Sequence, residues 1–163
     1  MIPEFTLYTD GCVLRNPDSS GWSALLIQEE KLIGWADGHI HHNINSQRAE
    51  LAAITIGVRL LLNERYLALG ENYTAKVFTD CQQLIDVVQR ARGTGCWPHM
   101  NADLWEKLGG MVVSGKVSLH RVKGHSRDFF NTLADHLART AASKGITSSA
   151  GSKTTTVRRM VLP

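Results

Sequence analysis

Two aspartates each follow a short apolar run of the kind that forms a β-strand. Asp10 follows the run in EFTLYTDG, and Asp80 follows the run in KVFTDCQQLI. An isolated carboxylate buried in the core of a sheet costs several kcal/mol. Two acids in the same local setting therefore suggest that the strands carry them to a shared site.

Two further acids lie on predicted helices. Glu50 is placed on or beside the apolar face of the helix predicted at 46–63, in one stripe with Ile54, Val58 and Leu61. Asp135 lies early in the last predicted helix and flanks a stripe formed by Ala134, Leu137, Ala138 and Ala141. Both helices are expected to direct an acid toward the sheet.

Each acid has an ordinary structural explanation when it is taken alone. An aspartate at a strand end commonly forms a turn or caps a helix, and an acid in the first turn of a helix interacts favourably with the helix dipole. Four converging carboxylates, however, repel each other unless cations lie among them. Magnesium, which prefers oxygen ligands, fits this set better than zinc, because no cysteine or paired histidine accompanies the acids.

The elements that must position these acids are predicted from apolar periodicity and turn residues. Strands at 4–9, 22–28 and 31–41 have short connections, which favours an antiparallel meander. After them, helices alternate with strands, which indicates a mixed sheet with helical cover. The predicted helices are 46–63 with Ser46 as cap, 81–90, 101–111, and a last one capped by Asn131 and ended by Gly145; the later strands are 75–79 and 116–122.

The length of 163 residues fits one domain, with 43% hydrophobic and 20% charged residues. We predict a catalytic domain at 1–145 and a flexible tail at 146–163, because the tail is polar and lacks periodicity. No apolar run is long enough to span a bilayer, and no secretory signal is recognised, so a cytoplasmic protein is expected. Three cysteines without metal-ligand spacing are expected to be reduced and structural. A net charge of +3 permits a polyanionic partner without requiring one.

Five motifs occur in an order that resembles type 1 ribonuclease H. They are YTDG with Asp10, SQRAEL with Glu50, FTDCQQL with Asp80, VKGH with His125 and NTLADHLA with Asp135. The resemblance covers roughly residues 4 to 143, and SQRAEL is similar to the retroviral version of the domain. It implies a ribonuclease H-like α/β fold: a five-stranded mixed sheet, three strands antiparallel and two parallel, flanked by helices on both faces.

The same resemblance implies a function and a role for each acid. The function is endonucleolytic hydrolysis of the RNA strand of RNA/DNA hybrids with two Mg²⁺ ions, for which Mn²⁺ substitutes, leaving 5′-phosphate and 3′-hydroxyl ends. Asp10 corresponds to the ligand shared by both ions, Glu50 and Asp80 to ligands on the leaving-group side, and Asp135 to the ligand on the nucleophile side. His125, in a glycine-containing loop, corresponds to a mobile histidine that moves protons or helps product leave.

Contacts to the hybrid are also implied. The resemblance places Asn16, Ser46, Gln47 and Gln82 at the minor groove, where amides can recognise a 2′-hydroxyl. It places Asn43, Asn45 and Asn101 at a phosphate of the DNA strand. Turn formation and capping explain Asn16, Asn43 and Asn45 equally well.

Some features depart from the family pattern. The stretch VVQRARGTGCWPHM is short where bacterial members often carry a basic handle, which favours a viral or retroelement origin, or a polymerase or reverse transcriptase partner that supplies affinity. Trp97 and Trp105 could stack on nucleic acid or pack in the core. A zinc site at His39, His41 and His42 is disfavoured because no carboxylate or thiol is suitably spaced. Alternatives to the hybrid-specific enzyme are a non-catalytic hybrid-binding module and another nuclease of the same fold. A monomer is expected.

Overall fold

The computed structural model describes residues 2–15, 18–40, 44–63, 72–123, 128–147 and 155–159. The strands and helices follow one another in the order β1 (Glu4–Arg15), β2 (Asp18–Gln28), β3 (Lys31–Ile40), α1 (Ser46–Val58), β4 (Thr74–Thr79), α2 (Gln82–Thr94), α3 (Ala102–Val113), β5 (Val117–Arg121), α4 (Phe129–Thr147) and β6 (Thr155–Arg159). A π-helical segment, Arg59–Asn63, continues α1. None of the described helices combines the length and apolarity that a membrane crossing requires.

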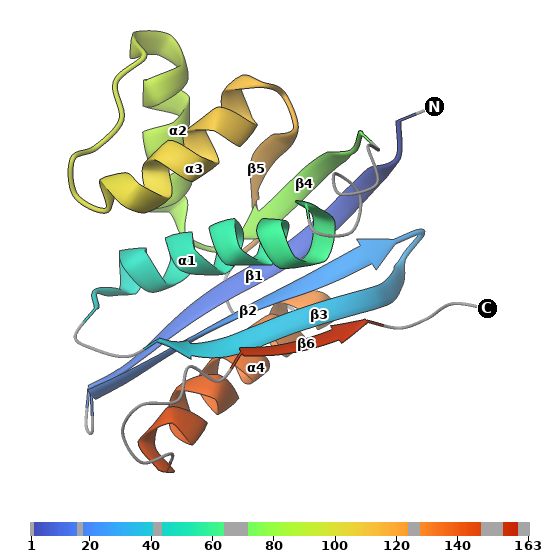
Figure 1. The fold of residues 1–163 in the computed structure, drawn as a ribbon, viewed down its shortest axis with the longest axis vertical. Helices are drawn as coiled ribbons and strands as arrows, with labels where there is room; N and C mark the ends of the chain where they lie inside the picture. Colours follow the sequence, from blue (N-terminus) through green and yellow to red (C-terminus); the bar gives the residue numbers. More distant parts are fainter. Residues whose placement is uncertain are drawn as a thin grey trace.

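One sheet holds all of these strands in the order β5-β4-β1-β2-β3-β6. The hairpin pairs β1–β2 and β2–β3 are antiparallel, whereas β4 is parallel to both β1 and β5. The five predicted strands and their mixed pairing are therefore confirmed. Figure 1 shows α1, α2 and α3 on one face of the sheet and α4 on the other, as predicted.

A sixth strand lies within the segment that was predicted as a flexible tail, residues 146–163. Residues 155–159 form β6, which pairs antiparallel with β3, from Gly34 opposite Arg159 to Gly38 opposite Thr155. A short threonine-rich and valine-containing segment suits a strand, but it lacks the alternating pattern by which strands are recognised from sequence. The predicted domain boundary near residue 145 remains a hypothesis.

The first hairpin is longer than predicted. β1 continues through Asp10 to Arg15, and β2 starts at Asp18. Residues 18–21, which look like turn formers in the sequence, instead pair with residues 12–15 of β1. The parallel pairing of β1 with β4, in contrast, ends at Tyr8 opposite Phe78. Asp10 is thus inside a strand rather than at its end, and it lies just past the point where β4 stops pairing with β1.

Two predicted helix caps are corrected. Asn45, not Ser46, caps α1: its side-chain oxygen accepts a hydrogen bond from the backbone N–H of Arg48 at 2.8 Å. At α4, Asp128 takes this role by accepting from the backbone N–H of Asn131 at 3.0 Å. An aspartate or asparagine caps at least as well as serine, so neighbouring candidates are hard to rank from sequence. Helix α4 also runs past Gly145 to Thr147.

The main core lies between the sheet and the helices α1, α2 and α3. Leu7, Leu51, Val77 and Trp105 are among its fully buried residues. The core role of Trp105 is thereby confirmed, since no part of its side chain is exposed. Trp97 is half-buried and packs against it, with ring centroids 5.8 Å apart. Stacking of Trp105 on nucleic acid is excluded by its burial.

Candidate active site

Three carboxylates meet at the end of the parallel pairing between β1 and β4. Asp10, Glu50 and Asp80 each offer one oxygen, and these oxygens lie within 4.8 Å of one another. Asp10 and Glu50 are buried, and Asp80 is half-buried directly after β4. The structure brings together three of the four acids for which the sequence predicted convergence.

Close packing of α1 against β1 brings Glu50 to this point. A Cβ atom added to Gly11 would lie 2.4 Å from the backbone carbon of Ala49 and from the backbone nitrogen of Glu50. Only glycine therefore permits the approach of the helix to the strand at this position. The backbone N–H of Gly11 also donates a hydrogen bond to the Glu50 carboxylate. The glycine of YTDG thus positions the glutamate of SQRAEL.

The electrostatics of the three acids favour uptake of protons or cations. Burial, followed by the charges of Asp80 and Asp135, raises the pKa of Asp10 to about 8. Burial and the charge of Asp10 likewise raise the pKa of Glu50 well above its ordinary value. Neighbouring carboxylates and burial each disfavour the charged form. A bound cation removes both penalties.

The oxygens also fit a hard divalent cation. Oε2 of Glu50 is buried and has no hydrogen-bond partner among the described residues, and a buried carboxylate oxygen without a partner is costly. All three side chains are oxygen donors, as Mg²⁺ and Mn²⁺ prefer. Asp10, Glu50 and Asp80 could therefore hold such an ion.

Asp135 lies near the three acids but is not one of the group. It raises the pKa of Asp10 through its charge, yet its own carboxylate is held by Arg139, whose Nε donates to the two oxygens at 2.8 and 3.0 Å. The guanidinium of Arg139 in turn lowers the pKa of Asp10. The sequence reading missed Arg139, although its position four residues after Asp135 on a helix was a usable signal.

Small residues bring α4 close enough to present Asp135. The hydroxyls of Ser19 and Ser23 on β2 donate to the backbone carbonyls of Ala142 and Ala134 at 2.6 and 2.7 Å. Between them, a Cβ atom on Gly21 would lie 2.3 Å from the carbonyl oxygen of Ala138. The alternation of Ser, Gly and Ser along β2 therefore fixes the height of α4 above the sheet and so the position of Asp135.

The residues predicted to contact the hybrid lie at the starts of α1, α2 and α3 or outside the described residues. Asn45, Ser46 and Gln47 lie at the start of α1, and Gln82 is the exposed first residue of α2, where its Nε2 donates to Asp86 at 2.7 Å. Asn101 precedes α3. The predictions for Asn16, Asn43 and His125 lie outside the described residues, as do His41 and His42.

A network at the facing ends of α1 and α3 links two of these positions. Arg48 donates to Oδ1 of Asn101 at 3.1 Å and forms a bidentate pair with Asp103, both bonds being 2.9 Å. Asn45 donates to the sulfur of Met100 at 3.7 Å. Asn101 has a φ of 62°, and its buried Nδ2 has no partner among the described residues. The sequence reading missed Arg48, which connects the two asparagines.

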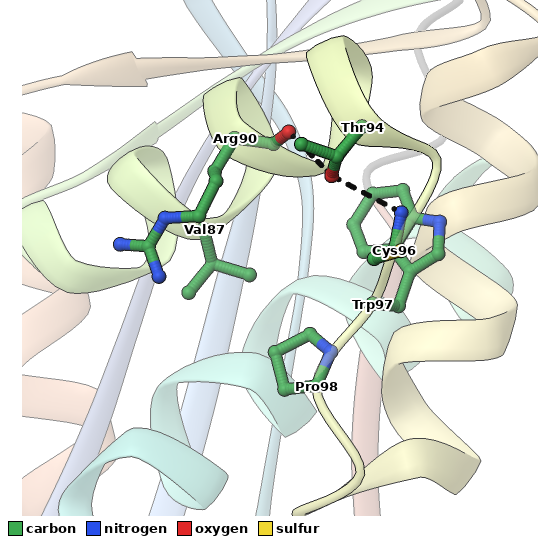
Figure 2. A pocket seen from close by; sticks show the side chains of 6 residues that line it. All are labelled: Val87, Arg90, Thr94, Cys96, Trp97 and Pro98. Carbon is green, nitrogen blue, oxygen red and sulfur yellow. Dashed lines mark hydrogen bonds between the residues drawn. The ribbon is translucent and has the colours of Figure 1, made fainter.

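The segment after α2, where the sequence lacks a basic handle, forms a pocket of about 420 Å³. Figure 2 shows its lining, with Thr94 at the end of α2 donating to the carbonyl of Arg90 at 3.0 Å and accepting from the backbone N–H of Cys96 at 3.2 Å.

Cys96 is exposed, so the expectation that all three cysteines are structural is wrong for this one; all three are free thiols, as predicted.

Comparison with known proteins agrees with this geometry. A family model described as RNase H matches residues 3–143. A ribonuclease H from Caldicellulosiruptor saccharolyticus is 30% identical over 152 residues, covering 85% of this chain and 95% of that protein.

Solved structures share the fold. LC9-RNase H1, a type 1 RNase H with the type 2 active-site motif, superposes with a TM-score of 0.69 at 21% identity, covering 94% of this chain and 79% of its own. LC11-RNase H1 in complex with an RNA/DNA hybrid superposes with a TM-score of 0.64 at 14% identity, covering 87% and 99%. The acidic site, the family match over most of the chain and the curated relative lead to one conclusion: the chain belongs to the ribonuclease H family and is a hydrolytic nuclease.

Proposed function

We propose that this protein cuts the RNA strand of RNA/DNA hybrids as an endonuclease, using two Mg²⁺ ions and leaving 5′-phosphate and 3′-hydroxyl ends. The observation that carries the proposal is the meeting of Asp10, Glu50 and Asp80, with oxygens within 4.8 Å of one another. The hybrid as substrate is supported by the family and by the LC11-RNase H1 structure, whose bound ligand is an RNA/DNA hybrid.

Each acid has a separate task in this proposal. Two bound ions would activate the attacking water and stabilise the departing 3′ oxygen. Asp10, whose pKa is raised by the charges of both Asp80 and Asp135, would be the shared ligand. Glu50 and Asp80 would hold the ion on the leaving-group side, while Asp135 would serve the nucleophile side after giving up part of its pairing with Arg139. Asp10 on β1 and Glu50 on α1 are buried, so these two ligands are already positioned by the fold, whereas Asp135 must rearrange.

Contacts at the two helix starts would recognise the hybrid. Ser46, Gln47 and Gln82, together with Asn16, carry hydroxyl or amide groups suited to the 2′-hydroxyls and base edges of the minor groove. Asn45 and Asn101, with Asn43, would bind a phosphate of the DNA strand. The unpartnered Nδ2 of Asn101 supports this assignment, because a buried donor without a partner gains a hydrogen bond when an acceptor arrives.

A substrate panel tests the proposal. Labelled RNA/DNA hybrid, double-stranded RNA and double-stranded DNA are incubated with Mg²⁺ and either the wild type, Asp10→Asn or the control Glu106→Gln, which removes an exposed acid from α3. We expect the wild type and the control to cut only the RNA of the hybrid, and Asp10→Asn to be slower by roughly a thousandfold, since a metal ion supplies several kcal/mol. Equal cleavage by Asp10→Asn, or cleavage of DNA duplex, would refute it.

His125 is assigned to proton movement or product release. Replacement by alanine should lower turnover by roughly a hundredfold or less without abolishing it, because the metal ligands remain. Steady-state and single-turnover rates on the hybrid separate the two roles: a slower first turnover indicates proton movement, and a slowing confined to later turnovers indicates product release. An unchanged rate in both measurements removes His125 from the mechanism.

A further inference from the structure

A row of aromatic side chains lies on the face of the sheet that α4 only partly covers. Tyr8 and Phe78 are paired across β1 and β4, and their rings stack with centroids 5.1 Å apart. Phe130 of α4 contacts Tyr8 at 5.5 Å, and Phe129 contacts Phe130 at 5.4 Å. Phe129 is 70% exposed. The row therefore runs from the sheet to an exposed ring at the start of α4.

Among the described residues, helix α4 packs against β1, β2 and β3 rather than against β4. On the opposite face of β4, Ala75, Val77 and Thr79 are buried under the helices, whereas Phe78 is half-buried and Lys76 is exposed. The aromatic row borders a pocket of about 650 Å³ at the same end of the sheet. That volume is in the range of pockets that bind small ligands or side chains.

The charge of this pocket is opposite to that of the whole chain. Among the described residues, its lining includes the acids Glu4, Glu29, Glu30 and Asp128 and no lysine, arginine or histidine, although the chain carries a net charge of +3. Glu4 is paired with Lys76 at 2.8 Å. Glu29 and Glu30 are exposed, and among the described residues they form no ion pair.

The two glutamates also form the turn between β2 and β3, with φ angles of 49° and 61°. Two-residue turns of this type favour asparagine and glycine, because other residues are strained at positive φ. The turn thus places two carboxylates at the pocket rim at a cost in stability.

Negative carboxylates beside aromatic faces attract cations and repel phosphates. A guanidinium or ammonium group over an aromatic ring gains from the negative face of the ring, and neighbouring carboxylates add to that attraction. We propose that this pocket, bounded by the β2–β3 turn, the start of β1 and the start of α4, binds a lysine- or arginine-rich peptide segment of a partner protein. The exposed Phe129 ring would contact an apolar residue of that segment.

The pocket extends from near the acidic site toward the start of β1. Tyr8 and Thr6, which line the pocket, are two and four residues before Asp10 on β1, or about 7 and 13 Å along an extended strand. The β1–β2 register confirms this direction, because Thr6 lies opposite Ile27 and Asp10 opposite Ser23. A cationic side chain bound at Glu29 and Glu30, at the far end of the pocket, would therefore lie away from the acidic site.

A binding experiment with a defined probe tests the proposal. The probe is a short fluorescent peptide in which arginines alternate with leucines and glycines; a second peptide has aspartate in place of arginine. Anisotropy is measured at low salt with the full chain, with Glu29→Gln/Glu30→Gln and with Phe129→Ala. Matched controls are Glu106→Gln and Val113→Ala, which remove an exposed acid and an exposed apolar side chain from α3.

We expect the arginine peptide to bind the wild type and both controls equally. The double glutamine variant should bind it about tenfold more weakly, and Phe129→Ala about threefold. Binding should also weaken as salt is added. Because all altered side chains are exposed, circular dichroism should show the wild-type fold for each variant.

Asp10→Asn and added Mg²⁺ distinguish the pocket from the acidic cluster, which could also attract a cationic peptide. Binding that is insensitive to both supports the pocket. Three outcomes would overturn the proposal: equal binding by all variants, loss of binding only in Asp10→Asn, and tighter binding of the aspartate peptide. None of these bears on hybrid cleavage, so the proposed function is tested separately.

Discussion

At the scale of single residues, the Asp10 carboxyl determines how the metal-free protein responds to pH. Its pKa is raised from 3.8 to about 8, first by burial and then by Asp80 and Asp135. Between those pH values the unfolded chain gives up this proton while the folded chain keeps it. Stability should therefore fall as pH rises from about 4 to about 8, in the absence of metal.

The variant Asp10→Asn should lose the part of this dependence that comes from Asp10, because an amide does not ionise, while Glu50, whose pKa is also raised by burial, keeps its own part. Without metal it should exceed the wild type in free energy of unfolding by at least about 1–2 kcal/mol at about pH 8, with a smaller difference at low pH. Urea unfolding in the presence of a chelator measures both values. A wild type that becomes more stable over this pH range would contradict the assignment, and added Mg²⁺ should reduce the difference by stabilising the wild type.

The residues of the candidate site were predictable from sequence to different extents. Asp10, Glu50 and Asp80 could be identified because an acid at the end of an apolar run, or on an apolar helix stripe, has few stabilising explanations when several occur together. Arg139 was missed although its position four residues after Asp135 on one helix was visible in the sequence. Arg48 was missed because its partner, Asp103, lies on another helix and becomes evident only when the two helices are placed.

At the scale of elements, the approach of α1 to β1 decides whether Glu50 reaches the site. Gly11→Ala would place a methyl group 2.4 Å from the backbone of Ala49 and Glu50. Because these are backbone atoms, the clash can be relieved only if the helix moves. We expect a loss of about 2–4 kcal/mol in the free energy of unfolding and a large loss of cleavage, because Glu50 is displaced from Asp10 and Asp80.

Gly110→Ala is the matched control for that variant. Gly110 lies in α3, and an added Cβ would meet no atom within 4 Å. Alanine is the better helix former, so this variant should be more stable by about 0.5–1 kcal/mol and should cleave hybrid at the wild-type rate. Thermal unfolding and cleavage assays on both variants provide the comparison. Similar behaviour of the two glycine variants would show that the close approach has no role in the site.

Element boundaries show where prediction from sequence ends. Residues 18–21 look like turn formers in DSSG, yet they belong to β2, because the small side chains are required under α4 rather than in a turn. Local propensity cannot report a requirement set by a helix more than a hundred residues later. The same limit explains β6, whose strand depends on the open edge of β3.

At the scale of the whole molecule, the topology of the sheet creates the site. β1 pairs with β2 as far as Arg15, but its parallel pairing with β4 ends at Tyr8. β1 therefore extends past the end of β4. Three acids meet beyond that end: Asp10 from β1, Asp80 directly after β4 and Glu50 from α1. A mixed sheet with antiparallel and parallel pairs was predictable, but the extension of β1 past the end of β4 was not, and this extension helps to bring distant acids together.

The charge distribution divides the molecule into two regions with different tasks. The acidic cluster beside β4 can bind phosphate groups only if cations first neutralise it. The acidic and aromatic pocket, which extends from Tyr8 toward the start of β1, has no buried carboxylate oxygen without a partner among the described residues, and it is suited to a cationic side chain instead of an ion.

The measurement that tests the central claim most directly compares Asp80→Asn with the wild type in two assays. Single-turnover cleavage of an RNA/DNA hybrid with Mg²⁺ measures the role of the acid in metal binding, and urea unfolding without metal measures its role in the fold. If Asp80 is a metal ligand, cleavage should fall by roughly a thousandfold, while the free energy of unfolding stays the same or rises because repulsion within the cluster is relieved. Cleavage at the wild-type rate, or a metal-free protein that is less stable than the wild type, would show that Asp80 is a structural cap and would contradict the account.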